Sequence, residues 1–326
     1  MNKIQDKALL VSLNISQWTA RKYDKAATAQ VAEHYKTPET AGRYNKVLIA
    51  QDQLREITKI ANEMRTYHYE VTLPYRAAGS SILATAIMPE YMAKSSELSA
   101  RFHTAVKAFM DAYPDLRAQA RITLNGLYRD EDYPSMRELA KKFNFNVDFY
   151  PIPEGSHLRI NIDADDLREI QQDIEDKVRD SMKVAMDDLW RRLYGVTAAM
   201  KDRLTLDSNG SQKIFRDSMI GNIRALAELL PKLNFTDDPD LAMVAAELGA
   251  GLGQYEPDEL RENDDVRKEA LAKANGILKK IGQLRGGNAP ADEPEPDPVA
   301  PEPDPEPVKE PEAESMADKL RKAGVI

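Results

Sequence analysis

The sequence predicts a predominantly helical α+β fold with a small β-sheet or hairpin, a long central helix and a disordered acidic tail. Apolar residues recur at three- and four-residue steps over most of the chain up to about residue 284, which is the spacing of amphipathic helices. Two short stretches instead alternate apolar and polar residues, as half-buried strands do. From Asn288 the composition changes to proline and acidic residues, which cannot form a packed core.

Residues 1–163 are expected to form a mixed α+β region with a strand and a hairpin. Leu9 to Ser16 alternates with a period of two and predicts a strand whose odd-numbered residues face the core. Thr40 is expected to cap a long helix that reaches His68. The sequence also predicts helices over 24–35, 89–113 (ended by Pro114), 115–127 and 135–143, extended chain over 71–75 and 81–87, and a β-hairpin over 144–162.

Residues 164–287 are expected to form a helical region. Helical spacing continues from Asp165 to about Leu204, which at 1.5 Å per residue gives a rod of roughly 60 Å. Such a length favours a coiled coil or a projecting arm over a helix of a compact domain. Shorter helices are expected over 214–231, 239–252 and 257–284.

The tail divides into a linker, residues 288–315, and a terminal peptide, residues 316–326. The linker holds nine of the 19 prolines and ten acidic residues against one lysine, so we expect a disordered spacer with a polyproline II bias. The terminal peptide is too short for a stable helix alone and is expected to dock as an amphipathic helix on a partner or on the protein's own body. Its candidate partner-binding residues are Met316, Lys319, Leu320, Arg321, Lys322, Val325 and Ile326.

Composition limits the class of protein. The chain has no cysteine, which excludes disulfides and thiolate sites and is typical of a reducing compartment. No apolar run is long enough to span a bilayer, and Ser12 and Asn14 interrupt the N-terminal apolar stretch, unlike the core of a signal peptide. We therefore expect a soluble cytoplasmic protein with no membrane partner. Residues 1–129 hold 18 basic and 12 acidic side chains, a net charge of +6 that permits an anionic partner.

The chain contains no recognisable catalytic or cofactor motif, so the sequence predicts no enzyme and assigns no catalytic, cofactor-binding or metal-binding residue. The histidines are scattered, and His68 is expected in the core. Acidic clusters at 163–166 and 237–240 precede predicted helices, where carboxylates cap backbone N–H groups, although a hard cation is an alternative. The glycines of 248–253 are expected to end a helix and not to bind phosphate.

Aromatic residues and cations are interleaved near the N-terminus. Bases can stack on aromatic rings while cations follow phosphates, which makes this region a candidate for binding single-stranded nucleic acid. The alternative is that these side chains are the edges of amphipathic helices, since Tyr44 falls on an apolar helical stripe. The candidate nucleic-acid-binding residues are Trp18, Arg21, Lys22 and Tyr23.

Two segments, LVSLNISQWTARKYDK and FRDSMIGNIRALAELLPKLNFTDDPDL, resemble an uncharacterised family found in tailed bacteriophages and integrative elements. The likeness covers the body to about residue 284 and excludes the tail. The residues that carry it are Trp18, Thr19, Arg21 and Lys22 in the first segment and Asn234, Thr236, Asp238 and Pro239 in the second. The resemblance transfers no site residue, but it implies neighbouring genes for MoxR-type AAA+ ATPases and von Willebrand A-domain proteins.

Two hypotheses of function follow. The first is a non-catalytic phage or mobile-element accessory protein in the bacterial host cytoplasm, a helical adaptor for a protein partner such as an AAA+ ATPase. The second is a single-stranded nucleic-acid-binding protein with a regulatory acidic tail. The sequence does not predict the oligomeric state.

Overall fold

The computed structural model describes residues 4–76, 79–158, 160 and 162–285. The predicted linker and terminal peptide lie outside these residues. Within them, the strands are β1 (Ala8–Ser16), β2 (Arg21–Tyr23), β3 (Asn45–Val47), β4 (Leu73–Pro74), β5 (Ser81–Ala84) and β6 (Asn144–Tyr150). The helices are α1 (Ile4–Lys7), α2 (Lys25–Tyr35), α3 (Arg55–Val71), α4 (Met88–Leu124), α5 (Met136–Ala140), α6 (Ala164–Leu204), α7 (Asp217–Leu233), α8 (Pro239–Gly251), α9 (Pro257–Glu262) and α10 (Asp264–Leu284). The predominantly helical α+β class is confirmed.

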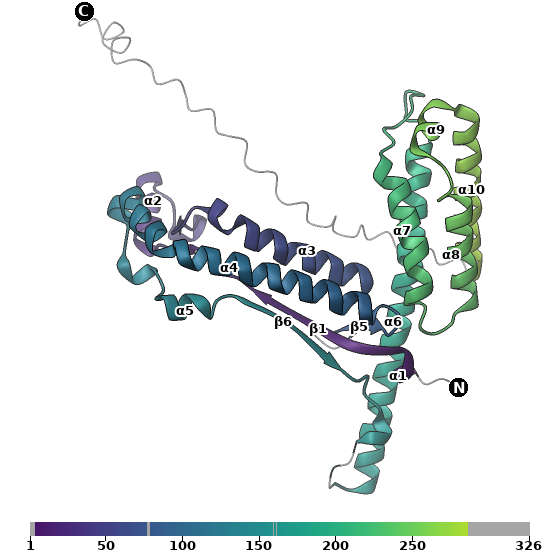
Figure 1. Cartoon of the computed structure of the whole chain (residues 1–326), viewed down its shortest axis with the longest axis horizontal. Helices are drawn as coiled ribbons and strands as arrows, with labels where there is room; N and C mark the ends of the chain where they lie inside the picture. The colour runs from purple at the N-terminus through teal and green to yellow at the C-terminus, as the bar shows by residue number, and fades with distance from the viewer. Residues whose placement is uncertain (1–3, 77–78, 159, 161, 286–326) are drawn as a thin grey trace, which may run out of the picture. The chain divides into compact units, whose positions relative to one another are not determined.

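A four-stranded antiparallel sheet with the order β4-β5-β1-β6 organises the first half of the chain. Helices α3 and α4 lie side by side along it (Figure 1). The strand predicted from the alternation is confirmed, but both Leu10 and Val11 are buried. The first half of β1 is therefore covered on both faces, and only its second half follows the expected in-and-out pattern.

The predicted hairpin over 144–162 is confirmed only in its first strand, because residues 159 and 161 of the predicted return strand lie outside the described residues. Its first strand exists as β6, but β6 pairs with β1 in a register that sets Leu10 opposite Tyr150. Pro151 and Pro153 follow β6 and cannot donate ladder hydrogen bonds. The chain then forms a 3-10 turn against α6, at which Gly155 lies so close that an added Cβ would be 2.3 Å from the Gln171 carbonyl oxygen.

Two predicted helix boundaries in the N-terminal half are also wrong. Thr40 lies in a 3-10 turn and caps no long helix, which begins only at Arg55. Pro114 does not end a helix but lies inside α4. The buried Phe109 and Tyr113 pack this part of α4 into the core, and that packing offsets the backbone hydrogen bond that proline removes.

The long central helix is confirmed as α6, which has 41 residues. Its second half packs against α7, α8 and α10 and buries side chains that include Ala185, Leu189 and Leu193. The later helices differ from expectation at their ends. Ile214 precedes α7 and is 77% exposed, Pro231 lies inside α7, and Asn263 starts a new helix by accepting hydrogen bonds from the first turn of α10.

Arg192 of α6 connects the helical region to the mixed α+β region. Its guanidinium donates to the carbonyl oxygens of Glu70 (2.5 Å), Thr72 (2.8 Å) and Tyr69 (3.0 Å) at the end of α3, and to Asp188 (2.8 Å). The two regions predicted at 1–163 and 164–287 thus form one compact unit in the described part of the chain.

His68 is a fully hydrogen-bonded core residue, as predicted. It is 4% exposed, with Nδ1 2.7 Å from the Tyr91 hydroxyl and Nε2 3.2 Å from the Ser81 hydroxyl. Burial lowers the pKa of His68 from 6.5 to about 4 and raises the pKa of Tyr91. The imidazole is therefore neutral at pH 7.

We expect this histidine to make stability depend on pH. Because the folded pKa is below the unfolded value, the stabilisation is complete above pH 6.5 and is lost as pH falls toward 4. At pH 5 the loss should be about 2 kcal/mol in the free energy of unfolding. Urea unfolding at pH 7.5, 6 and 5 checks this. His68→Gln, which keeps hydrogen-bonding capacity but does not titrate, should remove most of the slope, and an equal slope in both proteins would contradict the assignment.

Candidate functional site: the tyrosine groove

The candidate site lies where α2 and the β2–β3 ribbon meet the C-terminal end of α4. Trp18 anchors the chain before the ribbon, because its ring packs against Phe109 (6.2 Å between centroids) and Tyr113 (5.8 Å) of α4. Ala20 follows with a positive φ of 51° and accepts a hydrogen bond from the Leu48 N–H. This turn starts the antiparallel ribbon that pairs Arg21–Tyr23 with Asn45–Val47.

A buried ion network fixes the ribbon to its surroundings. The side chain of Lys46 is 3% exposed and its ammonium contacts Asp24 (2.8 Å) and Asp132, and donates to the Leu127 carbonyl oxygen (3.1 Å). Lys22 forms a second ion pair with Asp132 (2.8 Å). The contact between Lys46 and Asp132 Oδ2 is an ion pair without ordinary hydrogen-bond geometry. The network thereby holds together three segments of the chain, near residues 22–24, 46 and 127–132.

The network keeps its members charged. Burial alone would lower the pKa of Lys46, but its contacts with Asp132 and Asp24 outweigh burial and raise it. Burial likewise opposes ionisation of Asp132, yet Lys22 and Lys46 hold its pKa below the usual value. The hydrogen bond from Lys46 lowers the pKa of Asp24. The buried ammonium of Lys46 therefore stays protonated between the ionised carboxylates of Asp24 and Asp132.

Beside this network is a surface groove with a volume of about 290 Å³, which we call the tyrosine groove. It is lined by Ala27, Gln30, Val31, His34, Tyr35, Tyr44 and Leu127. Three of these side chains are unusually exposed for their size: Val31 (47%), Tyr35 (70%) and Tyr44 (39%). The backbone at Tyr44 is held to α2, since its N–H donates to Thr28 and its carbonyl accepts from the Asp24 N–H.

The candidate nucleic-acid-binding residues separate in the structure. Trp18 is 8% exposed and packed into the core, so its ring is not available for stacking. Arg21 and Tyr23 are exposed on β2, and the Arg43 guanidinium lies 6.0 Å from the centre of the Tyr23 ring. Lys22 is half exposed but engaged by Asp132. Only Arg21 and Tyr23 of the predicted set present free surface.

Tyr35 and Tyr44 belong to the interleaved aromatic residues of the N-terminal region, but the predicted site residues do not include them or Val31. Tyr44 was placed on the apolar stripe of a helix over 40–68 that does not form. The signal that could have located it is the turn-forming run from Lys36 to Gly42, which separates α2 from β3.

The other predicted polar clusters have structural roles. Asp163 caps α6 and Asp238 caps α8 by accepting backbone N–H hydrogen bonds, as expected. Gly249, Gly251 and Gly253 lie at the end of α8, also as expected, although no left-handed residue forms the cap. Across the residues that the structure describes, no group of three acidic or histidine side chains is arranged to hold a metal ion. None of the described helices has the length and apolar character needed to cross a membrane.

Comparisons with protein-family models, curated proteins and solved structures find no match. The resemblance to the phage and integrative-element family therefore stays a prediction from the sequence, and the site must be interpreted from its own geometry.

We expect Lys46→Met to destabilise the protein by about 3 kcal/mol, because it removes the buried cation that pairs with Asp24 and leaves Asp132 with Lys22 alone. Urea unfolding at pH 7 measures this. Adding Asp132→Asn to the variant should recover part of the loss. Lys107→Met, which breaks an exposed ion pair with Asp111, serves as the control and should leave stability almost unchanged. A loss no larger for Lys46 than for Lys107 would contradict the buried network.

Proposed function

We propose that the protein is a non-catalytic accessory protein that binds a protein partner through the tyrosine groove. The observation that carries this is the combination of exposed Tyr35, Tyr44 and Val31 with a rigidly held backbone. Tyrosine is enriched in protein interfaces, because it contributes a large contact area with few rotatable bonds to immobilise. An exposed apolar hollow on an otherwise ordinary surface is typical of interaction sites.

Rigidity supports the same proposal. The groove wall is held by the Lys46 network and by the packing of Trp18 on α4. A partner that binds here would find the side chains already positioned, which lowers the entropy cost of association.

The proposed partner is an AAA+ ATPase of the MoxR type, in a phage or mobile element acting in the host cytoplasm. The resemblance of the Trp18 and Asn234 segments to phage and integrative-element proteins supports this choice. The geometry supports only the weaker statement of a protein-binding groove.

A MoxR-type AAA+ ATPase from the same phage or mobile element should bind the full chain in biolayer interferometry. Tyr35→Ala and Tyr44→Ala should each weaken binding at least about tenfold, as interface anchors do. Tyr69→Ala is the matched control, because Tyr69 is as exposed (68%) but lies on α3. No binding by the wild-type chain, or equal losses for Tyr69 and Tyr35, would overturn the proposal.

Single-stranded nucleic acid is a second candidate ligand. The specific observation in its favour is the exposed ribbon, where Arg21, Tyr23 and Arg43 combine cations with a ring on which a base could stack. The burial of Trp18 argues against it, since the largest predicted stacking surface is absent.

A labelled single-stranded DNA titrated at low and moderate salt tests this alternative. If it holds, fluorescence anisotropy should show salt-sensitive binding that Arg21→Ala combined with Arg43→Ala reduces. Arg168→Ala removes an exposed arginine elsewhere and is the control. Undetectable binding at low salt would eliminate this candidate and leave the protein-binding proposal standing.

A further inference from the structure

The first turns of α6 form a second surface, distinct from the tyrosine groove. We call residues 164–180 the α6 arm. None of its residues is buried, in contrast to the second half of the helix. Figure 1 shows the arm extending away from the sheet, accompanied among the described residues by the chain that leads from β6 to α6. Only the first part of α6, residues 164–180, thus has the exposure expected of a projecting arm.

The arm carries an apolar stripe that the body does not cover. Leu167, Ile170 and Ile174 recur at steps of three and four residues, which places them on one face of the helix. Ile170 is 39% exposed, and Leu167 and Ile174 are partly exposed. Val178, one turn further, packs against the core, but these three are not among the described side chains that do so.

The residues around this stripe carry an excess of negative charge. Residues 163–180 contain eight acidic and three basic side chains, a net charge of −5. Each cation is already paired within the arm: Arg168 with Asp165, Lys177 with Asp173, and Arg179 with Asp176. In the part of the chain that the structure describes, no ion pair reaches Asp166, Glu169 or Glu175. These three carboxylates are therefore available to pair with cations of a partner.

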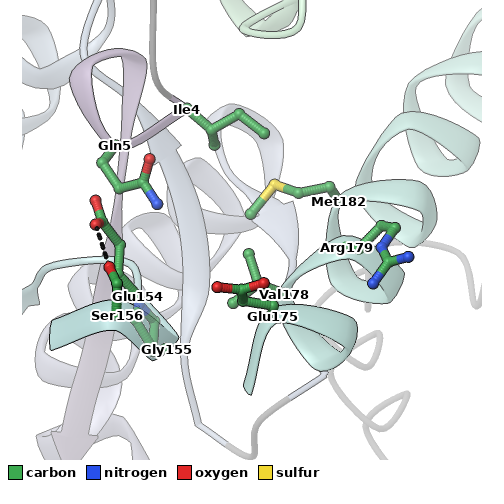
Figure 2. A pocket seen from close by; sticks show the side chains of 10 residues that line it. Ile4, Gln5, Glu154, Gly155, Ser156, Glu175, Val178, Arg179 and Met182 are labelled. Atoms are coloured by element: carbon green, nitrogen blue, oxygen red, sulfur yellow. Dashed lines mark hydrogen bonds between the residues drawn. The ribbon is translucent and has the colours of Figure 1, made fainter. Parts of the chain in front are cut away.

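A cavity of about 460 Å³ lies where the arm meets the body (Figure 2). Ile4, Val178 and Met182 supply apolar surface to it, and Glu175 supplies a carboxylate. Arg179 also lines the cavity and is paired with Asp176. The close approach of Gly155 to Gln171 positions the wall of the cavity against α6. The cavity suits a side chain with an aliphatic stem and a positive end, such as lysine or arginine.

We propose that the α6 arm is a docking surface for a basic amphipathic helix of a partner protein. The apolar face of that helix covers Leu167, Ile170 and Ile174, and its cations face Asp166 and Glu175. One of those cations enters the cavity at the base of the arm. A second copy of the arm is a poor occupant, because pairing two arms, each with a net charge of −4 over residues 164–180, sets like charges together.

This surface is independent of the tyrosine groove, and the two together give the molecule the pair of contacts that an adaptor needs. The proposal does not require the groove to bind anything. A Tyr35→Ala variant should therefore bind the basic helix as the wild type does.

The test uses the full chain and two fluorescein-labelled synthetic helices of about three heptads, with leucine at positions a and d. One carries lysine at e and g, and the other carries glutamate. Fluorescence anisotropy should show the lysine peptide binding at least about tenfold more tightly than the glutamate peptide, with an affinity that falls as salt rises.

Two variants localise the binding. Ile170→Ser should weaken it at least about fivefold, while Ile214→Ser, an exposed isoleucine outside the arm, should not. Asp166→Lys with Glu175→Lys should abolish the preference for lysine, whereas Glu228→Lys with Asp265→Lys should preserve it. Circular dichroism confirms that each variant is folded.

The proposal is overturned if both peptides bind equally, or if the arm variants bind the lysine peptide as the wild type does. Sedimentation velocity gives a further outcome. A dimer of the wild-type chain that Ile170→Ser dissociates would assign the stripe to a second copy and also overturn the proposal.

Discussion

The hydrogen bonds of Arg192 are the constraint on which the arrangement of the molecule depends. The last carbonyl groups of a helix lack intrahelical donors and carry partial negative charge. A single guanidinium from α6 satisfies the carbonyls of Tyr69 and Glu70 near the end of α3, and that of Thr72 just beyond it. Asp188, itself buried, orients the guanidinium. Removing the arginine would leave three carbonyl oxygens without this donor and Asp188 with Arg191 alone, so the junction between the two regions is specific in geometry.

That junction places two chemically different surfaces on one body. The tyrosine groove offers aromatic contact area beside the exposed cations Arg21 and Arg43, in the half of the chain that carries a positive excess. The α6 arm offers an aliphatic stripe bordered by carboxylates. Under the two proposals, this difference in charge would let each surface reject the ligand of the other.

The sequence predicted the fold class and most helices, because amphipathic spacing and capping residues are local signals. Asp24 and Ser135 cap their helices, and the β1 alternation appears in the chain itself. The errors came from contacts between distant residues. Continuation of α4 through Pro114 depends on core packing, and the partner of β6 is a strand more than a hundred residues earlier. The groove could not be predicted for the same reason, because its lining combines residues of α2 and Tyr44 with Leu127, which is distant in the sequence.

The distance along the chain between Lys46 and Leu127 also sets an order of events during synthesis. The two residues are separated by 81 positions, and Asp132 follows later still. At about 5–20 residues per second, the ribosome needs roughly 4–16 s to supply the second half of this network after the first. During that interval Lys46 cannot form its ion pair with Asp132, because Asp132 has not yet been synthesised. On the nascent chain, the β2–β3 ribbon therefore cannot be fixed in place before the end of α4 is synthesised. The groove is complete only when that helix has left the ribosome.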